Sequence, residues 1–230
     1  ITNVADAETG LDTQALVRRN AESFLAAAVI VAEGPTEIGL VRGLDYFWVG
    51  CRQNPLSLEG IAISDGGGIT QAASRASAFA RLGYRTLWLM DSDRPLTPAE
   101  RAPLDQADVS IISWAGGQAT EDALFNGLAW SDVLRMVEIA EEIWGEVHLD
   151  QGLRSVSEGR IGLEDCRRAD NPGHRAFLAV ASKQQGWFKR IDFGERVGQE
   201  VLGPGYGRAA PQLRATVDEI YRWTRGGQEH

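Results

Sequence analysis

Short apolar runs recur through the first half of the chain, and each run ends in a polar or glycine-rich stretch. The four runs are AVIVA at 28–32, GIAIS at 60–64, TLWLM at 86–90 and VSIIS at 109–113. Apolar runs of this length are typical of parallel strands that are buried on both faces. Because helical patterns lie between them, the sequence predicts an α/β fold with a mostly parallel four-stranded sheet flanked by helices.

Apolar positions at helical spacing separate these runs and continue beyond them. Between the strands we expect helices at 35–48, at 69–82 and at a short segment that opens with Thr97-Pro98. A further helical pattern leads from about residue 16 into the first run. After residue 127 the expected helices are 131–146 with Ser131 as N-cap, 161–169, 173–183, 193–201 and 211–225, with a GPGYG turn before the last.

The change from strands to helices predicts three parts. Residues 1–127 would form the first part of the α/β domain, and 128–179 a small inserted helical domain. Residues 180–230 would close the α/β domain. A chain of 230 residues with 43% hydrophobic residues has enough apolar side chains for one sizeable core with a small second domain.

Acidic residues follow two of the predicted strands, where an open parallel sheet presents its ligand site. Glu33 ends the first run, and Asp91 and Asp93 follow the third. Glu37 falls in the first turn of the helix after Pro35, so it can face the same crevice. Converging carboxylates need a cation to stay ionised together, and Mg²⁺ or Mn²⁺ suits hard oxygen ligands. Taken singly, Glu37 is explained as a first-turn acid and Asp-Ser-Asp as a turn.

Charge is distributed unevenly along the chain. The net charge is −9, yet residues 1–165 hold 12 Lys and Arg against 25 Asp and Glu, whereas residues 166–230 hold 11 against 7. An acidic part that gathers cations beside a mildly basic part is compatible with a metal-dependent enzyme that acts on a polyanion. Charge alone is explained as well by a solvated acidic surface.

The length of the apolar stretches and the spacing of the cysteines indicate in which cellular compartment the protein is expected. The longest apolar stretch, at 24–32, is far shorter than the roughly 20 residues of a membrane-spanning helix, so we expect no membrane association. Cys51 and Cys166 match no metal-binding or redox spacing. A reducing, cytoplasmic setting is therefore predicted.

Basic residues near the C-terminal end offer candidates for contacts with a substrate. Only two of the 23 basic residues are lysines, Lys183 and Lys189, and both lie in SKQQGWFKR. A lysine provides a compact ammonium that can also release a proton, although two lysines can also cluster by chance at a solvated helix end. Arg190 and Arg196 are candidates for contacts with backbone phosphates, which add affinity without sequence readout.

The motifs VIVAEGPTE and LWLMDSD resemble the Toprim domain of topoisomerases, primases and several nucleases. The E-G-P-T-E form, with its second Glu, is similar to the nucleases of the OLD (overcoming lysogenisation defect) family, and together with D-S-D-R-P it resembles the class 2 branch, found beside a helicase gene. The resemblance covers roughly residues 15–125 and, more loosely, 183–190. The third acid of topoisomerase-type Toprim domains is replaced here by Pro95.

The resemblance implies a DNA endonuclease with two Mg²⁺ or Mn²⁺ ions. The implied metal ligands are Glu33, Glu37, Asp91 as the bridging ligand, Asp93 and Glu121. Glu121 is explained equally by the first turn of a helix behind Thr120 as N-cap. The resemblance also favours a catalytic lysine, for which we choose Lys189 first and Lys183 second.

The OLD resemblance further implies partners and a role. Members of the family carry an ATPase domain ahead of the Toprim part, and no G-x-x-x-x-G-K-[ST] loop occurs in this chain, so we expect an upstream ATPase domain and no ATP site here. DNA would be the substrate, with a helicase encoded nearby and a role in phage defence or DNA repair. Two alternatives stay open: a primase-like or RNA-processing Toprim enzyme, and a non-catalytic nucleic-acid-binding module.

Overall fold

A four-stranded sheet forms the centre of the computed structural model, which describes residues 21–226. All neighbouring strands are parallel, and their order is β2-β1-β3-β4. The strands are β1 (Ala28–Ala32), β2 (Ile61–Asp65), β3 (Arg85–Met90) and β4 (Ser110–Ser113). The predicted α/β fold with a parallel four-stranded sheet is confirmed, and every predicted strand agrees with the structure to within one residue at each end.

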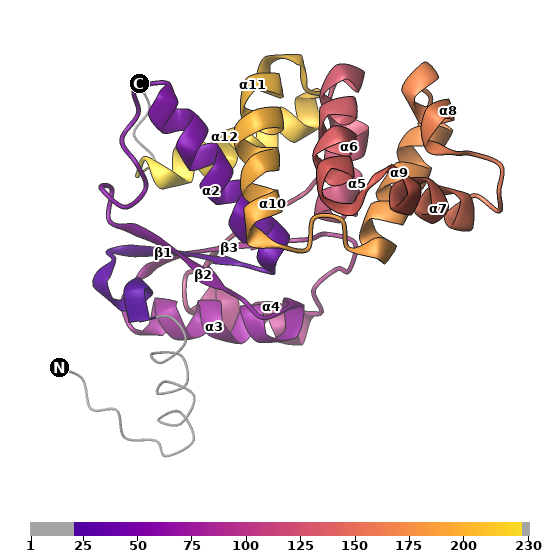
Figure 1. Cartoon of the computed structure of the whole chain (residues 1–230). Helices are drawn as coiled ribbons and strands as arrows, with labels where there is room; N and C mark the ends of the chain where they lie inside the picture. Colours follow the sequence, from indigo (N-terminus) through magenta and orange to yellow (C-terminus); the bar gives the residue numbers. More distant parts are fainter. Residues whose placement is uncertain (1–20, 227–230) are drawn as a thin grey trace.

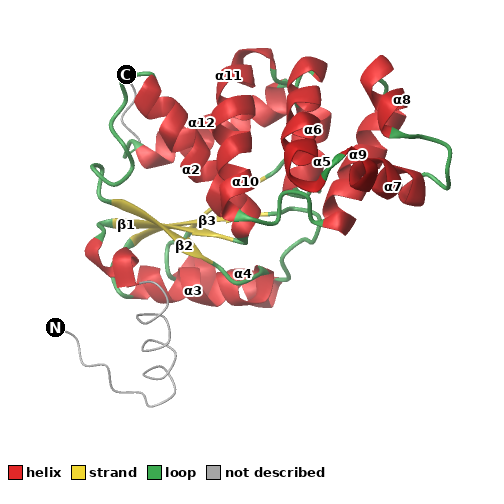
Figure 2. Ribbon diagram, viewed as in Figure 1, coloured by secondary structure: helices red, strands yellow, loops and turns green. Residues whose placement is uncertain are grey.

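Helices cover both faces of the sheet, which explains why the strands are apolar throughout. On one face lie α3 (Ile69–Arg81) and α4 (Pro98–Gln106), and on the other lie α2 (Pro35–Gly50) and the later helices (Figures 1 and 2). In β1, Val29 and Val31 pack into the core beneath α3, whereas Ile30 packs into the larger core beneath α2. All three side chains are fully buried, as expected for a strand covered by helices on both faces.

Between residues 120 and 226 the chain is mostly helical. Its helices are α5 (Thr120–Gly127), α6 (Trp130–Trp144), α7 (Glu146–Val156), α8 (Leu163–Arg168), α9 (Pro172–Gln185), α10 (Ile191–Arg196), η2 (Val197–Leu202), α11 (Gly203–Gly205), η3 (Tyr206–Arg208) and α12 (Pro211–Thr224). Two predicted N-caps are displaced toward the N-terminus: Ala119 caps α5 in place of Thr120, one residue earlier, and Ala129 caps α6 in place of Ser131, two residues earlier.

Helix α7 was not predicted from the sequence. The helix expected at 131–146 ends at Trp144, and Gly145, with φ of +82°, separates it from α7. Gly152 lies inside α7 and interrupts the helical pattern of the sequence. In the structure Gly152 packs against the side chains of Gln185 and Trp187, so a residue that commonly breaks helices serves here for close packing.

The segment GPGYG, predicted as a turn, is helical. The chain passes without a break from α10 through the π-helical η2 into α11 and the 3-10 helix η3. A Cβ atom on Gly203 would collide with the ring of Phe47, and one on Gly205 would lie 2.8 Å from the carboxylate of Asp132. These glycines allow neighbouring side chains to approach the helix, and they do not end it.

Helices α2 and α10 cross at glycine residues. Gly39 and Gly43 of α2 face Gly194 and Gly198, and a Cβ on any of the four would collide with the opposite backbone. This close approach fixes the residues just before α10 against the start of α2, where the Thr36 hydroxyl donates to the carbonyl of Phe188 at 3.1 Å.

Residues 128–179, predicted as an inserted helical domain, share their hydrophobic core with the rest of the structure. Val133 of α6, Leu149 of α7 and Leu178 of α9 belong to the same continuous buried cluster as Ile30 and Leu40. Figure 1 shows α7, α8 and α9 at the end of the molecule away from α2. The helical character predicted for 128–179 is confirmed, whereas the division into 1–127, 128–179 and 180–230 stays a prediction.

The predicted helix leading into the first strand lies partly outside the described residues. Where it is described, the chain forms only the short 3-10 helix η1 (Ala21–Leu25), which a bend separates from β1. Among residues 21–226, none of the helices has the length and apolar character required to cross a membrane.

Candidate active site

Two of the predicted acids meet because β1 and β3 are neighbours in the sheet. Ala32 pairs with Leu89, so Glu33 and Asp91 follow adjacent strand ends. The backbone N–H of Asp91 donates to Oε2 of Glu33 at 3.2 Å. Burial, and then the charge of Asp91, raise the pKa of Glu33. The carboxyl edge of the sheet therefore places these two acids together, as the sequence predicted.

Glu37 caps its own helix with one carboxyl oxygen and contacts Thr120 with the other. Its Oε2 accepts the backbone N–H of Gly34 at 2.9 Å and so caps α2, while its Oε1 lies 2.7 Å from the hydroxyl of Thr120. The side chain is buried, with 5% of its surface exposed. Burial, and then the charge of Asp91, raise the pKa of Glu37 to about 8, so this carboxyl is mostly protonated at neutral pH.

Thr120 lies between two acids from different elements. Its Oγ1 accepts from Nε1 of Trp114 at 2.6 Å and lies 2.7 Å from Glu37 and 2.9 Å from Oδ1 of Asp91, which also accepts the Thr120 backbone N–H at 2.8 Å. A hydroxyl has one proton and can donate to only one carboxylate. The other contact is satisfied if protonated Glu37 donates to Thr120 and Thr120 donates to Asp91.

Glu121 faces both lysines that the sequence singled out. It is 5% exposed, and burial, followed by the charge of Asp91, raises its pKa, whereas the charges of Lys189 and Lys183 lower it. Nζ of Lys183 forms an ion pair with Oδ2 of Asp122 at 2.7 Å. The side chain of Lys189 is exposed and has no ion-pair partner among residues 21–226. The acids Glu33, Glu37, Asp91 and Glu121 are called the acidic cluster below. The structure thus brings both lysines to this cluster.

Asp93 lies at the exposed side of the cluster. Its charge helps to raise the pKa of Glu33 and of Asp91, although burial contributes most to both shifts. The loop between the two aspartates is held by Ser92, whose hydroxyl donates to the carbonyl of Trp114 at 2.5 Å and accepts the N–H of Gln118 at 2.8 Å. Sequence reasoning missed Ser92 and Thr120, because nothing in the local pattern shows which loop each contacts.

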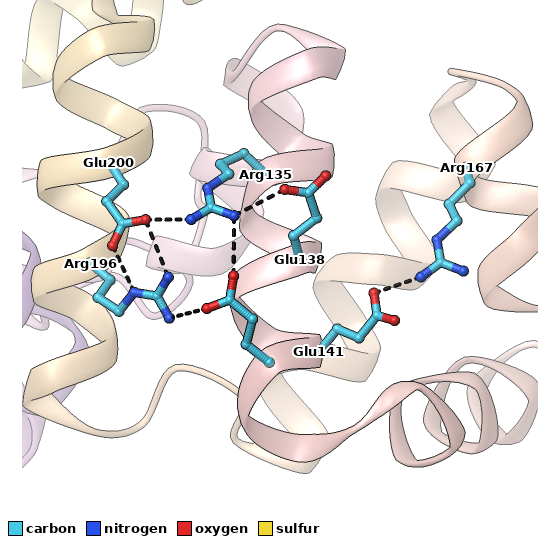
Figure 3. Close-up of polar contacts among 7 residues, drawn as sticks. Arg135, Glu138, Glu141, Arg167, Arg196 and Glu200 are labelled. Carbon is cyan, nitrogen blue, oxygen red and sulfur yellow. Dashed lines mark hydrogen bonds and ion pairs between the residues drawn. The ribbon is translucent and has the colours of Figure 1, made fainter.

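The two candidate phosphate contacts have different surroundings. Arg190 is exposed, pairs with exposed Asp192 at 2.7 Å and lies over the ring of Phe193. Arg196 belongs to the ion-pair network of Figure 3, which joins α6 to α10 and η2; it contacts Glu142 and Glu200 at 2.7 Å each. The charge of Arg196 is therefore already compensated, whereas Arg190 is accessible from solvent.

The acids offer suitable donors for Mg²⁺ or Mn²⁺ but are not arranged around an ion. Across the described range 21–226, no three His, Cys, Asp or Glu side chains are placed to hold a metal together. Both oxygens of Glu37 and one oxygen of Asp91 are taken by hydrogen bonds to Gly34 and Thr120. Metal binding therefore requires Glu37 to lose its proton and these contacts to change.

Comparison of the chain with protein-family models, with curated proteins and with solved structures gives no significant match. The similarity to OLD-family Toprim nucleases therefore depends on the sequence motifs alone. Family membership stays a prediction, and the chemistry of the site has to be argued from its own geometry.

Proposed function

We propose that the chain is a divalent-metal-dependent DNA endonuclease domain with a Toprim-type centre of the OLD class 2 branch. The observation that carries the proposal is the convergence of Glu33, Glu37, Asp91 and Glu121 at the carboxyl edge of a parallel sheet, with Lys189 facing them. Buried or half-buried acids whose pKa values are raised by burial and by neighbouring carboxylates are a costly arrangement, and such arrangements are concentrated at functional sites.

In this proposal the acidic cluster holds Mg²⁺ or Mn²⁺. The ligands would be Glu33, Glu37, Asp91, Asp93 and Glu121. Two such ions, when bound, would activate the attacking water and stabilise the leaving oxygen of a phosphodiester. The residues of the chain would supply the negative charge that retains the ions, and Glu37 would give up its proton and its contact with Thr120 to become a ligand.

The two lysines receive different roles in the proposal. Lys189 is exposed and unpaired within the described part of the chain, so its ammonium is available to a phosphate and would neutralise charge in the transition state. Lys183 is held by Asp122 at 2.7 Å and would instead fix the first turn of α5, which carries Glu121. Arg190 would contact the backbone of the bound strand.

The wider setting is part of the same proposal. The chain would be the nuclease portion of a larger ATPase-nuclease that acts in phage defence or DNA repair, with a helicase encoded nearby. A primase-like or RNA-processing enzyme would use the same acids on another substrate, and a binding module would need none of them for catalysis. Substrate comparisons and acid substitutions distinguish these alternatives.

The proposal is tested by incubating supercoiled plasmid and labelled RNA with the protein in EDTA, Mg²⁺, Mn²⁺ or Ca²⁺. We expect nicked and linear DNA with Mg²⁺ or Mn²⁺ only, and loss of cleavage in Glu33→Gln and Lys189→Met. Cleavage of RNA but not of plasmid would replace the proposal with the RNA-processing alternative. DNA binding that the two variants leave unchanged, without cleavage under any metal, would favour the binding module.

A further inference from the structure

We propose that the end of α6 and the start of α10 form a platform for the unpaired bases of a DNA strand beside the acidic cluster. The proposed platform consists of the rings of Trp144 and His148 together with the cations Lys189 and Arg190, and it is supported from below by the buried ring of Phe193. It rests on the proposed DNA endonuclease function and adds which form of DNA is bound, and where.

Three rings from three helices are packed together at this surface. Trp144, the last residue of α6, stacks on His148 of α7 with ring centroids 5.7 Å apart and an interplanar angle of 27°, and meets Phe193 of α10 edge-on at 6.3 Å. Trp144 keeps 37% of its surface exposed, and the neighbouring Val147 keeps 69%. Trp144 and Val147 therefore present apolar surface to solvent, whereas Phe193 is buried, with 5% of its surface exposed, and supports the indole from the interior.

Cationic groups border the rings on the side of the acidic cluster. The guanidinium of Arg190 lies 4.4 Å from the ring centroid of Phe193, and Lys189 precedes it in the chain with an exposed side chain. Arg190 also pairs with Asp192, but both side chains are more than half exposed, at 58% and 56%. Exposed ion pairs contribute little stability, so a phosphate can replace Asp192 as the partner of Arg190.

The segment 187–190 connects the platform to the acids. Nε1 of Trp144 donates to the carbonyl of Trp187 at 3.1 Å, and the next carbonyl, of Phe188, accepts from Thr36 at 3.1 Å. Thr36 directly precedes Glu37 in α2. Figure 1 shows the connection from α9 to α10 running below α6 to the sheet end of α10. A strand stacked on the rings would therefore continue past Lys189 toward the acidic cluster.

Aromatic faces combined with cations are the usual means of binding single strands. Bases stack on the rings without sequence preference, and the cations follow the phosphates. In a duplex the bases are paired and stacked on one another, so they are not free to stack on protein rings. The platform therefore favours DNA in which unpaired bases lie next to the cleaved bond, such as a single strand or a frayed end.

The test measures fluorescence anisotropy of labelled single-stranded DNA, duplex DNA and single-stranded RNA of equal length in EDTA, where no cleavage occurs. The variants are Trp144→Ala and Trp144→Phe, and the matched control is Tyr46→Ala, an exposed aromatic residue of α2 with 53% exposure. Stacking of one base contributes about 1–3 kcal/mol, so we expect Trp144→Ala to weaken single-strand binding about 5- to 150-fold. Trp144→Phe and Tyr46→Ala should change it less than about threefold.

Several outcomes would overturn the platform. One is unchanged affinity in Trp144→Ala, and another is an equal loss in Trp144→Phe, which would assign the effect to the hydrogen bond with Trp187. Tighter binding of RNA than of DNA would overturn the choice of substrate. Failure of the wild-type protein to bind single strands while it still nicks plasmid would reject the platform alone, whereas absence of both activities would reject the proposed function as well.

Discussion

At the scale of single residues, the site depends on how one hydroxyl proton is shared. Thr120 contacts Glu37 and Asp91 while it accepts from Trp114, and the arrangement is satisfied only if one carboxyl carries a proton. The pKa of Glu37, raised to about 8, favours Glu37 as that carboxyl. Its proton would then link α2, through Thr120, to the loop after β3.

The proton on Glu37 predicts that stability of the metal-free protein depends on pH. Its pKa is 4.5 in a free side chain and about 8 in the fold, so between these values the folded state binds the additional proton. Through Glu37 alone, the free energy of unfolding should then fall as pH rises from about 5 to 8, by at most about 1.4 kcal/mol per pH unit. Urea denaturation in EDTA at pH 5, 6.5 and 8 measures this slope.

The matched variant for that experiment is Glu37→Gln, which keeps the shape of the side chain and cannot titrate. Its slope should be clearly smaller than that of the wild type, with a remainder from Asp91 and Glu121, whose pKa values burial also raises. Identical slopes in the two proteins would show that Glu37 is not the protonated group.

Thr120 itself should matter for stability through its hydroxyl. Thr120→Val keeps the volume but leaves the indole N–H of fully buried Trp114 without an acceptor, and we expect a loss of about 1–3 kcal/mol. Thr120→Ser retains the hydroxyl and should lose less. Chemical denaturation of both variants at pH 7 compares them, and an equal loss in the two would assign the effect to the methyl group.

Substitutions of the two lysines should affect different properties, stability for Lys183 and catalysis for Lys189. Lys183→Met breaks the partly exposed ion pair with Asp122 and should cost no more than about 1 kcal/mol of stability. Lys189→Met should leave the thermal midpoint unchanged and reduce single-turnover plasmid nicking at least about 100-fold, as loss of a group that stabilises the transition state does. The reverse pattern would exchange the roles of the two lysines.

At the scale of elements, the crossing of α2 and α10 positions the lysine segment. Gly43→Ala would place a methyl group against the backbone of Glu195 and Gly198, and we expect a loss of about 1–3 kcal/mol because overpacked backbone has to move. Gly50→Ala, in the same helix but facing open space, is the control and should be neutral or slightly stabilising. Thermal denaturation compares them, and equal midpoints would contradict the close crossing.

The elements also show what the sequence could and could not reveal. Strand β1 was predicted correctly because its apolar run reflects burial on both faces, and the position of Glu33 just after the strand follows from the same run. Helix α7 and the helical GPGYG segment were missed because Gly152 and Gly203 are close-packing residues whose partners, Trp187 and Phe47, are distant in sequence. Contacts of Thr120 and Ser92 were missed for the same reason, since they depend on the tertiary fold.

At the scale of the whole molecule, one continuous core links the sheet to α9, which carries Lys183, and to the connection before α10, which carries Lys189. Ion pairs reinforce this link on the surface, where Arg135 and Arg196 share Glu142 and Glu200 between α6, α10 and η2 (Figure 3). The acids come from the acidic part of the chain and the lysines from the basic part. The acidic and the basic parts of the sequence therefore meet at the acidic cluster in the fold.

The most direct test of the central claim is nicking of supercoiled plasmid in Mg²⁺ by the wild-type protein and by Asp91→Asn. The control is Asp105→Asn, an exposed acid of α4 that pairs only with Arg101 among residues 21–226. We predict that wild type and Asp105→Asn nick the plasmid at similar rates and that Asp91→Asn, shown to be folded by circular dichroism, does not. Equal nicking by all three, or none by the wild type, would contradict a metal-dependent nuclease centre at the acidic cluster.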